Sequence, residues 1–194
     1  MARQINYEKL EAIKRSTMEL ISQQGYQKAT ISAVAKNAGV SAGYLYTHFE
    51  SKDALIDTLI HDVYMEVYSM LVAIGKESGD MGSKLKRFIN SLLDIPHEDP
   101  IKAKFLVSLA HDERFLKEFL GSDSHGIFDI AERVMIAGKK EGIFRDSLIV
   151  EELLLTTLNL PISSIYYGFI LGNDYSEQPD MHSRIADLCL NALK

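Results

Sequence analysis

With 194 residues, the chain is long enough for one small module and one larger core, and too short for several independent domains. Long stretches of Leu, Ile, Ala, Glu and Lys without any alternating apolar run favour an all-α protein over a sheet-based fold. The net charge of -6 is unevenly divided, because residues 1–52 hold 7 Lys and Arg against 4 Asp and Glu while residues 53–194 hold 14 against 23; attraction for phosphate is therefore expected only near the N-terminus.

The first predicted helix spans about residues 7–23 and ends at Gly25. Apolar residues recur at helical spacing and indicate one buried face, which consists of Leu10, Ile13, Leu20 and Ile21. The basic residues Lys9, Lys14 and Arg15 lie on other faces. Both solvation and contact with phosphate would account for them.

Residues 30–48 contain two short helices joined by a glycine turn. Thr30 is a favourable N-cap for the first helix, whose apolar face consists of Val34, Ala35 and Ala38. Gly39 tolerates the positive φ that ends this helix, and Ser41 caps the second, with Leu45 and Phe49 on its inner side. This spacing predicts a helix-turn-helix, in which the second helix enters a DNA major groove, although plain helical hairpins share it.

The stretch from Gly25 to Leu55 resembles the helix-turn-helix of the TetR family of transcriptional regulators. The matching residues are Gly25, Tyr26, Thr30, Ile31, Val34, Ala35, Ala38, Gly39, Val40, Ser41, Gly43, Leu45, Tyr46, His48, Phe49, Lys52 and Leu55. The resemblance implies a three-helix DNA-binding domain, followed by a helical domain that binds a small molecule and pairs with a second copy of the chain.

The resemblance also implies which residues contact DNA. Thr30 and Ile31 would lie against the backbone, and Ser32 would approach a base edge. Three further residues match family positions that contact phosphate, namely Tyr46, His48 and Lys52. The exposed residues of the second helix complete the expected set with Ser41, Ala42, Gly43, Tyr44 and Thr47. Arg3 is a candidate in an arm ahead of the first helix.

The expected recognition helix is poor in groups that read bases. It contains no Arg, Asn, Gln or Lys, the residues that pair with guanine or adenine through two hydrogen bonds. We therefore expect readout through Tyr44, through contact of Ala42 and Thr47 with thymine methyl groups, and through DNA shape. Apart from the resemblance, Tyr46 fits a packed aromatic residue and His48 a capping or core histidine.

A long helix is predicted over residues 51–74, beginning at the Ser51 cap, so we place a DNA-binding domain at 1–51 and a regulatory domain at 52–194. Five further helices are predicted, for about nine in total, at 83–95, 99–111, 113–142, 148–172 and 180–193. Glycines at 121–126 should interrupt the third of these, and Pro161 should kink the fourth, either shaping a cavity or serving packing alone.

Aromatic and sulfur-containing residues of the second domain are candidates for lining a ligand pocket, although most fit an ordinary core: Tyr64, Tyr68, Phe88, Phe105, Phe115, Met135, Tyr166 and Tyr167. By resemblance, the last two long helices, at about 150–171 and 180–193, form the homodimer interface. Their apolar residues are dense enough for a buried contact.

Other classes of function find little support. The pairs His61–Asp62 and His111–Asp112 are adjacent in sequence, which on a helix points the two side chains about 100° apart, so neither pair makes a metal site. No phosphate-binding glycine loop or catalytic constellation is present, and we expect neither enzymatic activity nor a cofactor.

The sequence also favours a cytoplasmic location. The N-terminus lacks the apolar run of a signal peptide, and the apolar stretch 153–172 is interrupted by Asn159, Pro161, Ser163 and Ser164, which favours a buried helix over a membrane span. The single Cys189 cannot form an internal disulfide, and we expect it to be a small apolar filler and not a redox group.

We therefore expect a homodimeric regulator, most simply a repressor, that binds a palindromic operator in double-stranded DNA and leaves it when a small molecule binds. Two alternatives stay open. In the first, the protein is a DNA-binding regulator that needs no ligand, or an activator. In the second, its N-terminal unit docks another protein instead of DNA.

Overall fold

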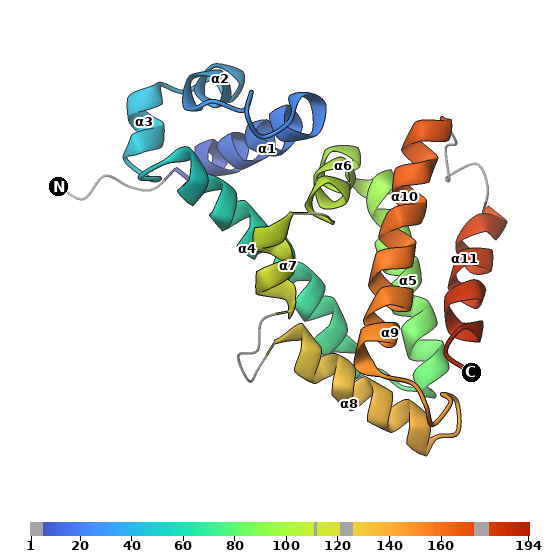
Figure 1. Cartoon of the computed structure of the whole chain (residues 1–194). Coiled ribbons are helices and arrows are strands. Elements are labelled where there is room, and N and C mark those ends of the chain that lie inside the picture. The colour runs from blue at the N-terminus through green and yellow to red at the C-terminus, as the bar shows by residue number, and fades with distance from the viewer. Residues whose placement is uncertain (1–5, 111, 121–125, 173–178) are drawn as a thin grey trace. The chain divides into compact units, whose positions relative to one another are not determined.

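The computed structural model describes residues 6–110, 112–120, 126–172 and 179–194. Within these ranges the regular secondary structure is entirely helical, which confirms the all-α prediction (Figure 1). The chain divides into two compact units, Met1–Asp62 and Val63–Lys194. Arg3, the candidate arm residue, lies outside the described residues, as does His111.

The first unit contains α1 (Tyr7–Gln24), α2 (Ile31–Asn37), α3 (Ala42–Tyr46) and the first half of α4 (Lys52–Ile74). Its core consists of aliphatic side chains from all four helices, including Ile13, Ile21, Val34, Leu45, Leu55, Ile56 and Leu59. The predicted helices therefore form, and the face expected to be buried on α1 is the one that packs. The expected caps form as well, since the hydroxyls of Thr30, Ser41 and Ser51 each accept an amide of their own helix.

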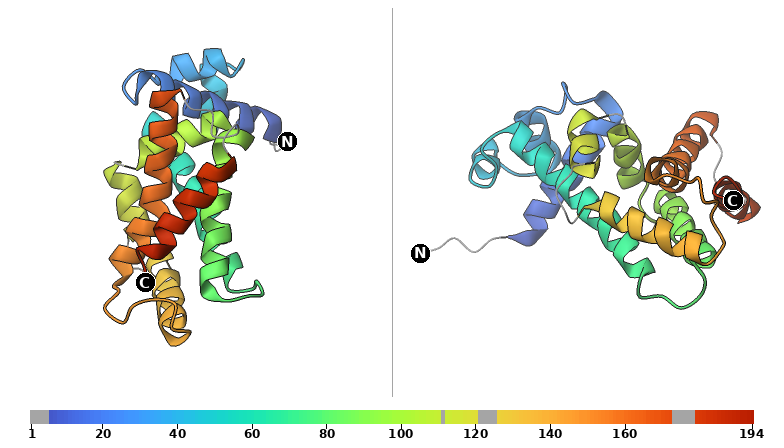
Figure 2. Two further views of the ribbon diagram at one scale, coloured as in Figure 1. Left: turned by 90° about the vertical axis from the view of Figure 1, so that its right-hand side faces the viewer. Right: turned by 60° about the horizontal axis from the view of Figure 1, so that its bottom comes forward.

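The second unit begins in α4 and continues with α5 (Met81–Glu98), α6 (Pro100–Leu109), α7 (Glu113–Leu120) and α8 (Ile127–Lys140). Then follow α9 (Val150–Leu154), the π-helical turn η1 (Leu155–Asn159) and α10 (Leu160–Leu171), which form one continuous run, and finally α11 (Pro179–Asn191). α5 packs against α6, α8, α10 and α11. Figure 2 shows α5, α10 and α11 side by side.

The stretch 113–142, which was expected to be interrupted at residues 121–126, contains two helices, α7 and α8. One helix boundary differs from the sequence-based expectation. α5 does not stop before Pro96 but continues to Glu98. Pro96 lies in the last turn of α5, and beyond it the Asp99 amide still donates to the Ile95 carbonyl at 2.8 Å.

The run Val150–Leu171 is the apolar segment that the sequence marks as a buried helix. By length and composition alone it could cross a membrane, a test that the core helices of water-soluble proteins also pass. Eight of its side chains are buried in the unit: Val150, Leu153, Leu154, Thr157, Leu158, Pro161, Ile162 and Ile165. This burial supports the core-helix interpretation.

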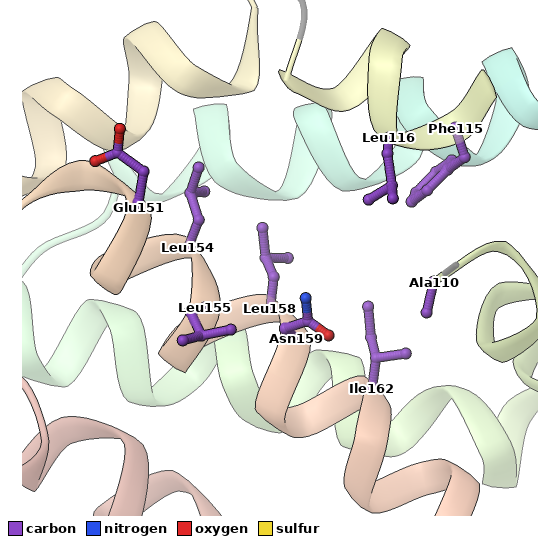
Figure 3. Close-up of a pocket in the computed structure, with 9 residues that line it drawn as sticks. All are labelled: Ala110, Phe115, Leu116, Glu151, Leu154, Leu155, Leu158, Asn159 and Ile162. Atoms are coloured by element: carbon purple, nitrogen blue, oxygen red, sulfur yellow. The ribbon is translucent and has the colours of Figure 1, made fainter. Parts of the chain in front are cut away.

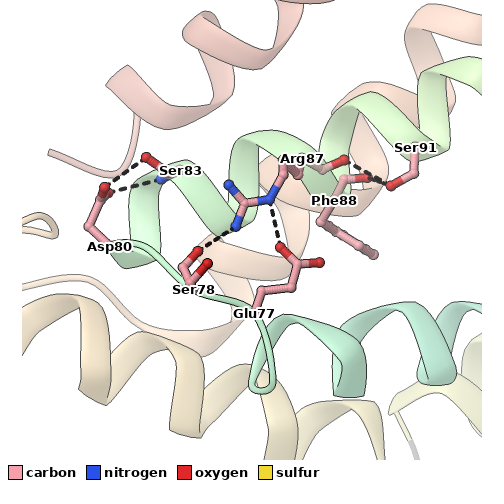
Figure 4. Close-up of polar contacts among 7 residues, drawn as sticks. All are labelled: Glu77, Ser78, Asp80, Ser83, Arg87, Phe88 and Ser91. Carbon is pink, nitrogen blue, oxygen red and sulfur yellow. Dashed lines mark hydrogen bonds and ion pairs between the residues drawn. The ribbon is translucent and has the colours of Figure 1, made fainter.

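The connection between α4 and α5 is held by polar contacts (Figure 4). Asp80 caps α5, because its carboxylate accepts the Ser83 amide at 2.9 Å and the Ser83 hydroxyl at 2.7 Å. The Arg87 guanidinium donates to the Glu77 carboxylate at 2.6 Å and to the Ser78 carbonyl at 2.9 Å. The predicted break around residues 76–82 is therefore a loop fastened to the first turns of α5.

Candidate nucleic-acid interface

The turn between α2 and α3 has the geometry of a helix-turn-helix. Gly39 adopts a φ of 66°, and the Val40 amide then donates to the Ala35 carbonyl at 2.9 Å, which closes the end of α2. The Ser41 hydroxyl accepts the Tyr44 amide at 3.1 Å and starts α3. On α1, the buried Ser16 hydroxyl donates to the Val34 carbonyl at 3.1 Å and ties α1 to α2.

α3 buries one side chain and exposes several. Leu45 is fully buried, whereas Gly43, Tyr46 and Thr47 are exposed, with Tyr46 at 59 % of its surface. The Thr47 hydroxyl donates to the Tyr44 carbonyl at 2.6 Å. Ala42, Ile31 and His48 are half-buried, and Thr30, Ser32 and Ser41 are exposed. The predicted DNA-contacting residues thus occupy neighbouring positions on α2, the turn and α3.

Tyr44 differs from the other residues of this set. Its side chain is half-buried and its hydroxyl oxygen is inaccessible to solvent. The ring lies against the His48 imidazole, with centroids 4.8 Å apart and an interplanar angle of 56°. The Lys9 ammonium, from the first turn of α1, lies 5.3 Å from the Tyr44 ring centroid. The expectation that Tyr44 reads a base stays untested, but in this arrangement its hydroxyl does not face outward.

The basic residues near this surface have different partners. The Lys52 ammonium donates to the Tyr26 carbonyl at 2.8 Å, and its two remaining protons are available to a phosphate. Lys14 forms an ion pair with Asp62 at 2.8 Å. The hydrogen bond to Asp62 raises the pKa of Lys14 against the opposing effect of partial burial. Its charge is therefore already compensated, which favours a structural role for Lys14.

The second unit contains a cavity of about 230 Å³. Its lining is almost entirely apolar and is drawn from the end of α6, from α7 and from the run α9–η1–α10: Ala110, Phe115, Leu116, Glu151, Leu154, Leu155, Leu158, Asn159 and Ile162. In Figure 3, Leu158 and Ile162 project from their helix toward Phe115 and Leu116 on α7. Such a site suits a ligand with a hydrocarbon part.

Of the residues expected to line a pocket, Phe115 lines this cavity. Phe88 and Phe105 are core residues, Tyr166 and Tyr167 are exposed on α10, and Met135 is half-buried. Tyr64 and Tyr68 stack on each other along α4, with centroids 6.1 Å apart. Sequence reasoning concentrated on aromatic residues and missed the aliphatic stripe at 154, 155, 158 and 162, whose helical spacing is visible in the sequence.

Groups suited to other chemistry are sparse in the part of the chain that the structure describes. No cluster of three or more His, Cys, Asp or Glu side chains there has the arrangement of a metal site. Cys189 is buried, and burial raises the pKa of its thiol to about 11. A thiol with that pKa is protonated at neutral pH, as expected for an apolar filler.

Known proteins resemble this chain in sequence and in fold. Residues 13–59 match the family model described as bacterial regulatory proteins of the tetR family. The HTH-type transcriptional repressor KstR2 of Rhodococcus jostii is 28 % identical over 141 residues, which cover 68 % of this chain and 66 % of that relative. The chain thus spans just under two thirds of that relative's length.

Two solved structures share the fold across nearly the whole chain. The fatty acid degradation regulator FadR from Bacillus halodurans superposes with a TM-score of 0.80 at 18 % identity and covers 99 % of both chains. FadR from Bacillus subtilis, solved in complex with stearoyl-CoA, has a TM-score of 0.77 at 17 % identity and covers 95 % of this chain and 99 % of its own. At these identities the likeness shows the fold alone.

Proposed function

The chain belongs to the TetR family of bacterial regulatory proteins, as its resemblance predicts, and we propose that it is a cytoplasmic, homodimeric repressor of transcription. Two copies bind a palindromic operator in double-stranded DNA, and a small molecule releases them. The observation that carries the proposal is the helix-turn-helix within residues 13–59, whose second helix leaves Gly43, Tyr46 and Thr47 exposed.

Binding by a dimer follows from the weak positive charge of residues 1–52. Residues 1–52 contribute a net charge of +3, from 7 basic and 4 acidic residues, and Lys14 is already paired with Asp62. Few phosphate contacts per chain give weak non-specific binding. Two recognition helices on one duplex double those contacts, and two-fold symmetry places the half-sites about 34–36 Å apart.

Exposed apolar side chains support a dimer contact through α10 and α11. The exposed residues of the run from η1 to the end of α10 include Leu155, Tyr166, Tyr167, Phe169, Ile170 and Leu171, and α11 adds Leu188. Large exposed patches of this kind mark interaction sites in water-soluble proteins. A second copy of the same surface would cover them by two-fold symmetry.

The inducer is proposed to carry a hydrocarbon chain that enters the cavity between α7 and the run α9–η1–α10. The apolar lining supports this class, and FadR of Bacillus subtilis binds stearoyl-CoA on the same fold. For release to occur, the ligand must bind the DNA-incompetent arrangement more tightly. The coupling is reciprocal, so the operator weakens the ligand by the same factor. The continuous helix α4 belongs to both units and is the proposed route of coupling.

Selection from random oligonucleotides tests DNA binding directly. The full-length protein is expected to enrich a two-fold symmetric sequence, and its affinity for that duplex should fall steeply with salt. Enrichment of no sequence by a folded protein would reject the proposal and favour docking of another protein.

Ligand release is tested with the selected duplex. Stearoyl-CoA should displace the protein, whereas free coenzyme A should not, because only the acyl chain fits the apolar cavity. An Ala110→Phe variant, which fills part of the cavity, should keep DNA binding and lose the response. Equal release by both compounds, or an unchanged response in the variant, would place the inducer elsewhere.

A further inference from the structure

We propose that Lys9 and Tyr44 form a brace that fixes the orientation of the recognition helix α3, and that neither residue is chiefly a DNA contact. The inference rests on the proposed DNA binding and adds a positioning role for two residues. The brace consists of the Lys9 ammonium on the face of the Tyr44 ring, with the His48 imidazole on the same ring.

α3 needs such support because it is short. It has five residues, from Ala42 to Tyr46, and only Leu45 is fully buried. Among the helices of the first unit, α3 packs chiefly against α2. A helix of little more than one turn, anchored by one core side chain, keeps freedom to rotate about that anchor. Rotation would move every exposed side chain of α3 relative to the base edges that carry the sequence information.

The Tyr44 side chain supplies a second anchor toward α1. Its hydroxyl is inaccessible to solvent and its ring carries Lys9 5.3 Å from the centroid. A cation over an aromatic face is attracted by the ring quadrupole, an interaction that amounts to about two- to fivefold in an equilibrium constant at an exposed site. The ring also contacts His48, which follows α3. Tyr44 thus joins the first turn of α1 to the residue that follows the C-terminal end of α3.

The division of labour on α3 follows from this arrangement. Tyr44 turns its ring toward α1, whereas Gly43, Tyr46 and Thr47 stay exposed. We therefore expect the small exposed residues Gly43 and Thr47 to contact the bases. Lys9 contributes to DNA binding indirectly, because it holds the Tyr44 ring in place. The simplest competing role for Lys9 is a direct ion pair with a DNA phosphate, since it is an exposed lysine near the proposed interface.

The salt dependence of binding separates the two roles. Four single variants are compared with the wild type on the duplex that the wild type selects: Lys9→Met, Lys9→Arg, Tyr44→Leu and Tyr44→Phe. Lys9→Met and Tyr44→Leu should each weaken binding about two- to fivefold without changing the slope of log affinity against log salt. Lys9→Arg keeps the cation and Tyr44→Phe keeps the ring. Both variants should therefore bind with the affinity and the base preference of the wild type.

A double variant completes the test. Lys9→Met combined with Tyr44→Leu should be no weaker than Tyr44→Leu alone, because Tyr44→Leu already removes the contact with Lys9. The proposal is overturned if Lys9→Met reduces the slope by about 0.9, the value for one lost phosphate contact, or if the two losses add. A shifted base preference in Tyr44→Phe would show that the hydroxyl reads DNA.

A measurement without DNA keeps the inference separate from the proposed function. In the free protein, the Lys9 side-chain methylene protons should show an upfield ring-current shift that disappears in Tyr44→Leu and persists in Tyr44→Phe. Absence of that shift in the wild type overturns the brace whatever the protein binds. If the shift is present but no duplex is selected, the brace stands as a feature of the unit while the proposed function fails. If Tyr44→Leu does not fold, the comparison of Lys9→Met with Lys9→Arg still tests the brace, because Lys9 is exposed and its substitution should not affect folding.

Discussion

Tyr44 and Tyr46 are separated by one residue on the same short helix, yet their side chains face different surroundings. Tyr46 is 59 % exposed, whereas the hydroxyl of Tyr44 is inaccessible to solvent. On a helix, residues two apart point about 200° away from each other, so one can face a groove while the other packs. Two chemically identical residues are therefore assigned different roles by direction alone.

Tyr46→Phe and Lys52→Ala should weaken binding to all duplex sequences alike, because both residues are proposed to contact phosphate. Lys52→Ala should also reduce the magnitude of the salt slope by about 0.9, whereas the uncharged Tyr46 should leave it unchanged. Binding profiles over a sequence library at several salt concentrations measure both effects.

Lys52 also donates to the Tyr26 carbonyl in the first unit. Thermal unfolding of Lys52→Ala controls for a loss of fold stability. A Lys52→Ala profile that favours new base sequences would contradict the assignment to phosphate.

Gly138 on α8 illustrates a residue whose identity is fixed by packing. A Cβ atom there would lie 2.1 Å from a ring carbon of the buried Phe144, closer than any real contact allows. Gly138→Ala should therefore lower the free energy of unfolding by about 1–3 kcal/mol, as overpacking in a core does. Chemical denaturation measures it.

Gly75→Ala is the matched control, because the added Cβ would meet only the Val72 carbonyl oxygen at 3.5 Å. A second test is the combination of Gly138→Ala with Phe144→Leu, which should cost less than the sum of the two single changes. Additive losses would show that the ring is not the source of the clash.

At the scale of helices, local signals predicted most of the fold. Caps at Thr30, Ser41 and Ser51, together with apolar residues at helical spacing, located α1 to α4 because these signals act within one or two turns. The lining of the cavity could not be predicted from such local signals, because it comes from α6, α7 and the run α9–η1–α10. The direction of the Tyr44 ring could not be predicted from the sequence either, because it depends on the position of α1 relative to α3.

A kink was expected near Pro161, and the structure has the π-helical turn η1 directly before this residue. Pro161 has no amide, so the carbonyl four residues earlier loses its usual partner. In η1 the Leu160 amide instead donates to the Leu155 carbonyl, five residues earlier. This wider turn supplies Leu155, Leu158 and Asn159 to the cavity lining. Of the two roles considered for Pro161, shaping the cavity is the one this geometry favours.

Asp112 links the stability of α7 to pH. Partial burial opposes its charged form, but the Arg114 side chain and the amides of Phe115 and Arg114 outweigh that effect and lower the pKa of Asp112. A carboxyl group with a lowered folded-state pKa stabilises the protein above its unfolded pKa, about 3.9, and this contribution disappears as the pH falls through the folded-state value.

The difference in Tm between the wild type and Asp112→Asn should therefore be constant above about pH 5 and shrink below pH 4. Calorimetry across this range measures it. The change should also loosen Phe115 in the cavity wall, so Asp112→Asn should weaken binding of an apolar ligand. A difference in Tm that persists at pH 2 would show that the carboxylate's charge is not responsible.

At the scale of the whole molecule, the two units differ in charge and in exposed chemistry. The excess of basic residues lies in residues 1–52, around the proposed DNA surface of the first unit, and the second unit carries exposed apolar residues on α10 and α11. Each feature is inadequate alone, because a weakly charged monomer binds DNA poorly and an apolar patch is a solubility liability. Pairing two chains through the second unit would cover the apolar patch and would also double the number of DNA contacts.

Ile170→Asp tests this pairing, because Ile170 is 59 % exposed on α10 and a charge there costs little in the monomer. The variant should stay folded, sediment as a monomer and lose most of its affinity for a two-half-site duplex. Binding to a single half-site should be unchanged, since the recognition helix is untouched. Ile136→Asp on α8 is the matched control, at 56 % exposure and outside the proposed interface, and should remain dimeric. If Ile170→Asp stays dimeric while Ile136→Asp does not, the partner surface lies on α8 and not on α10 and α11.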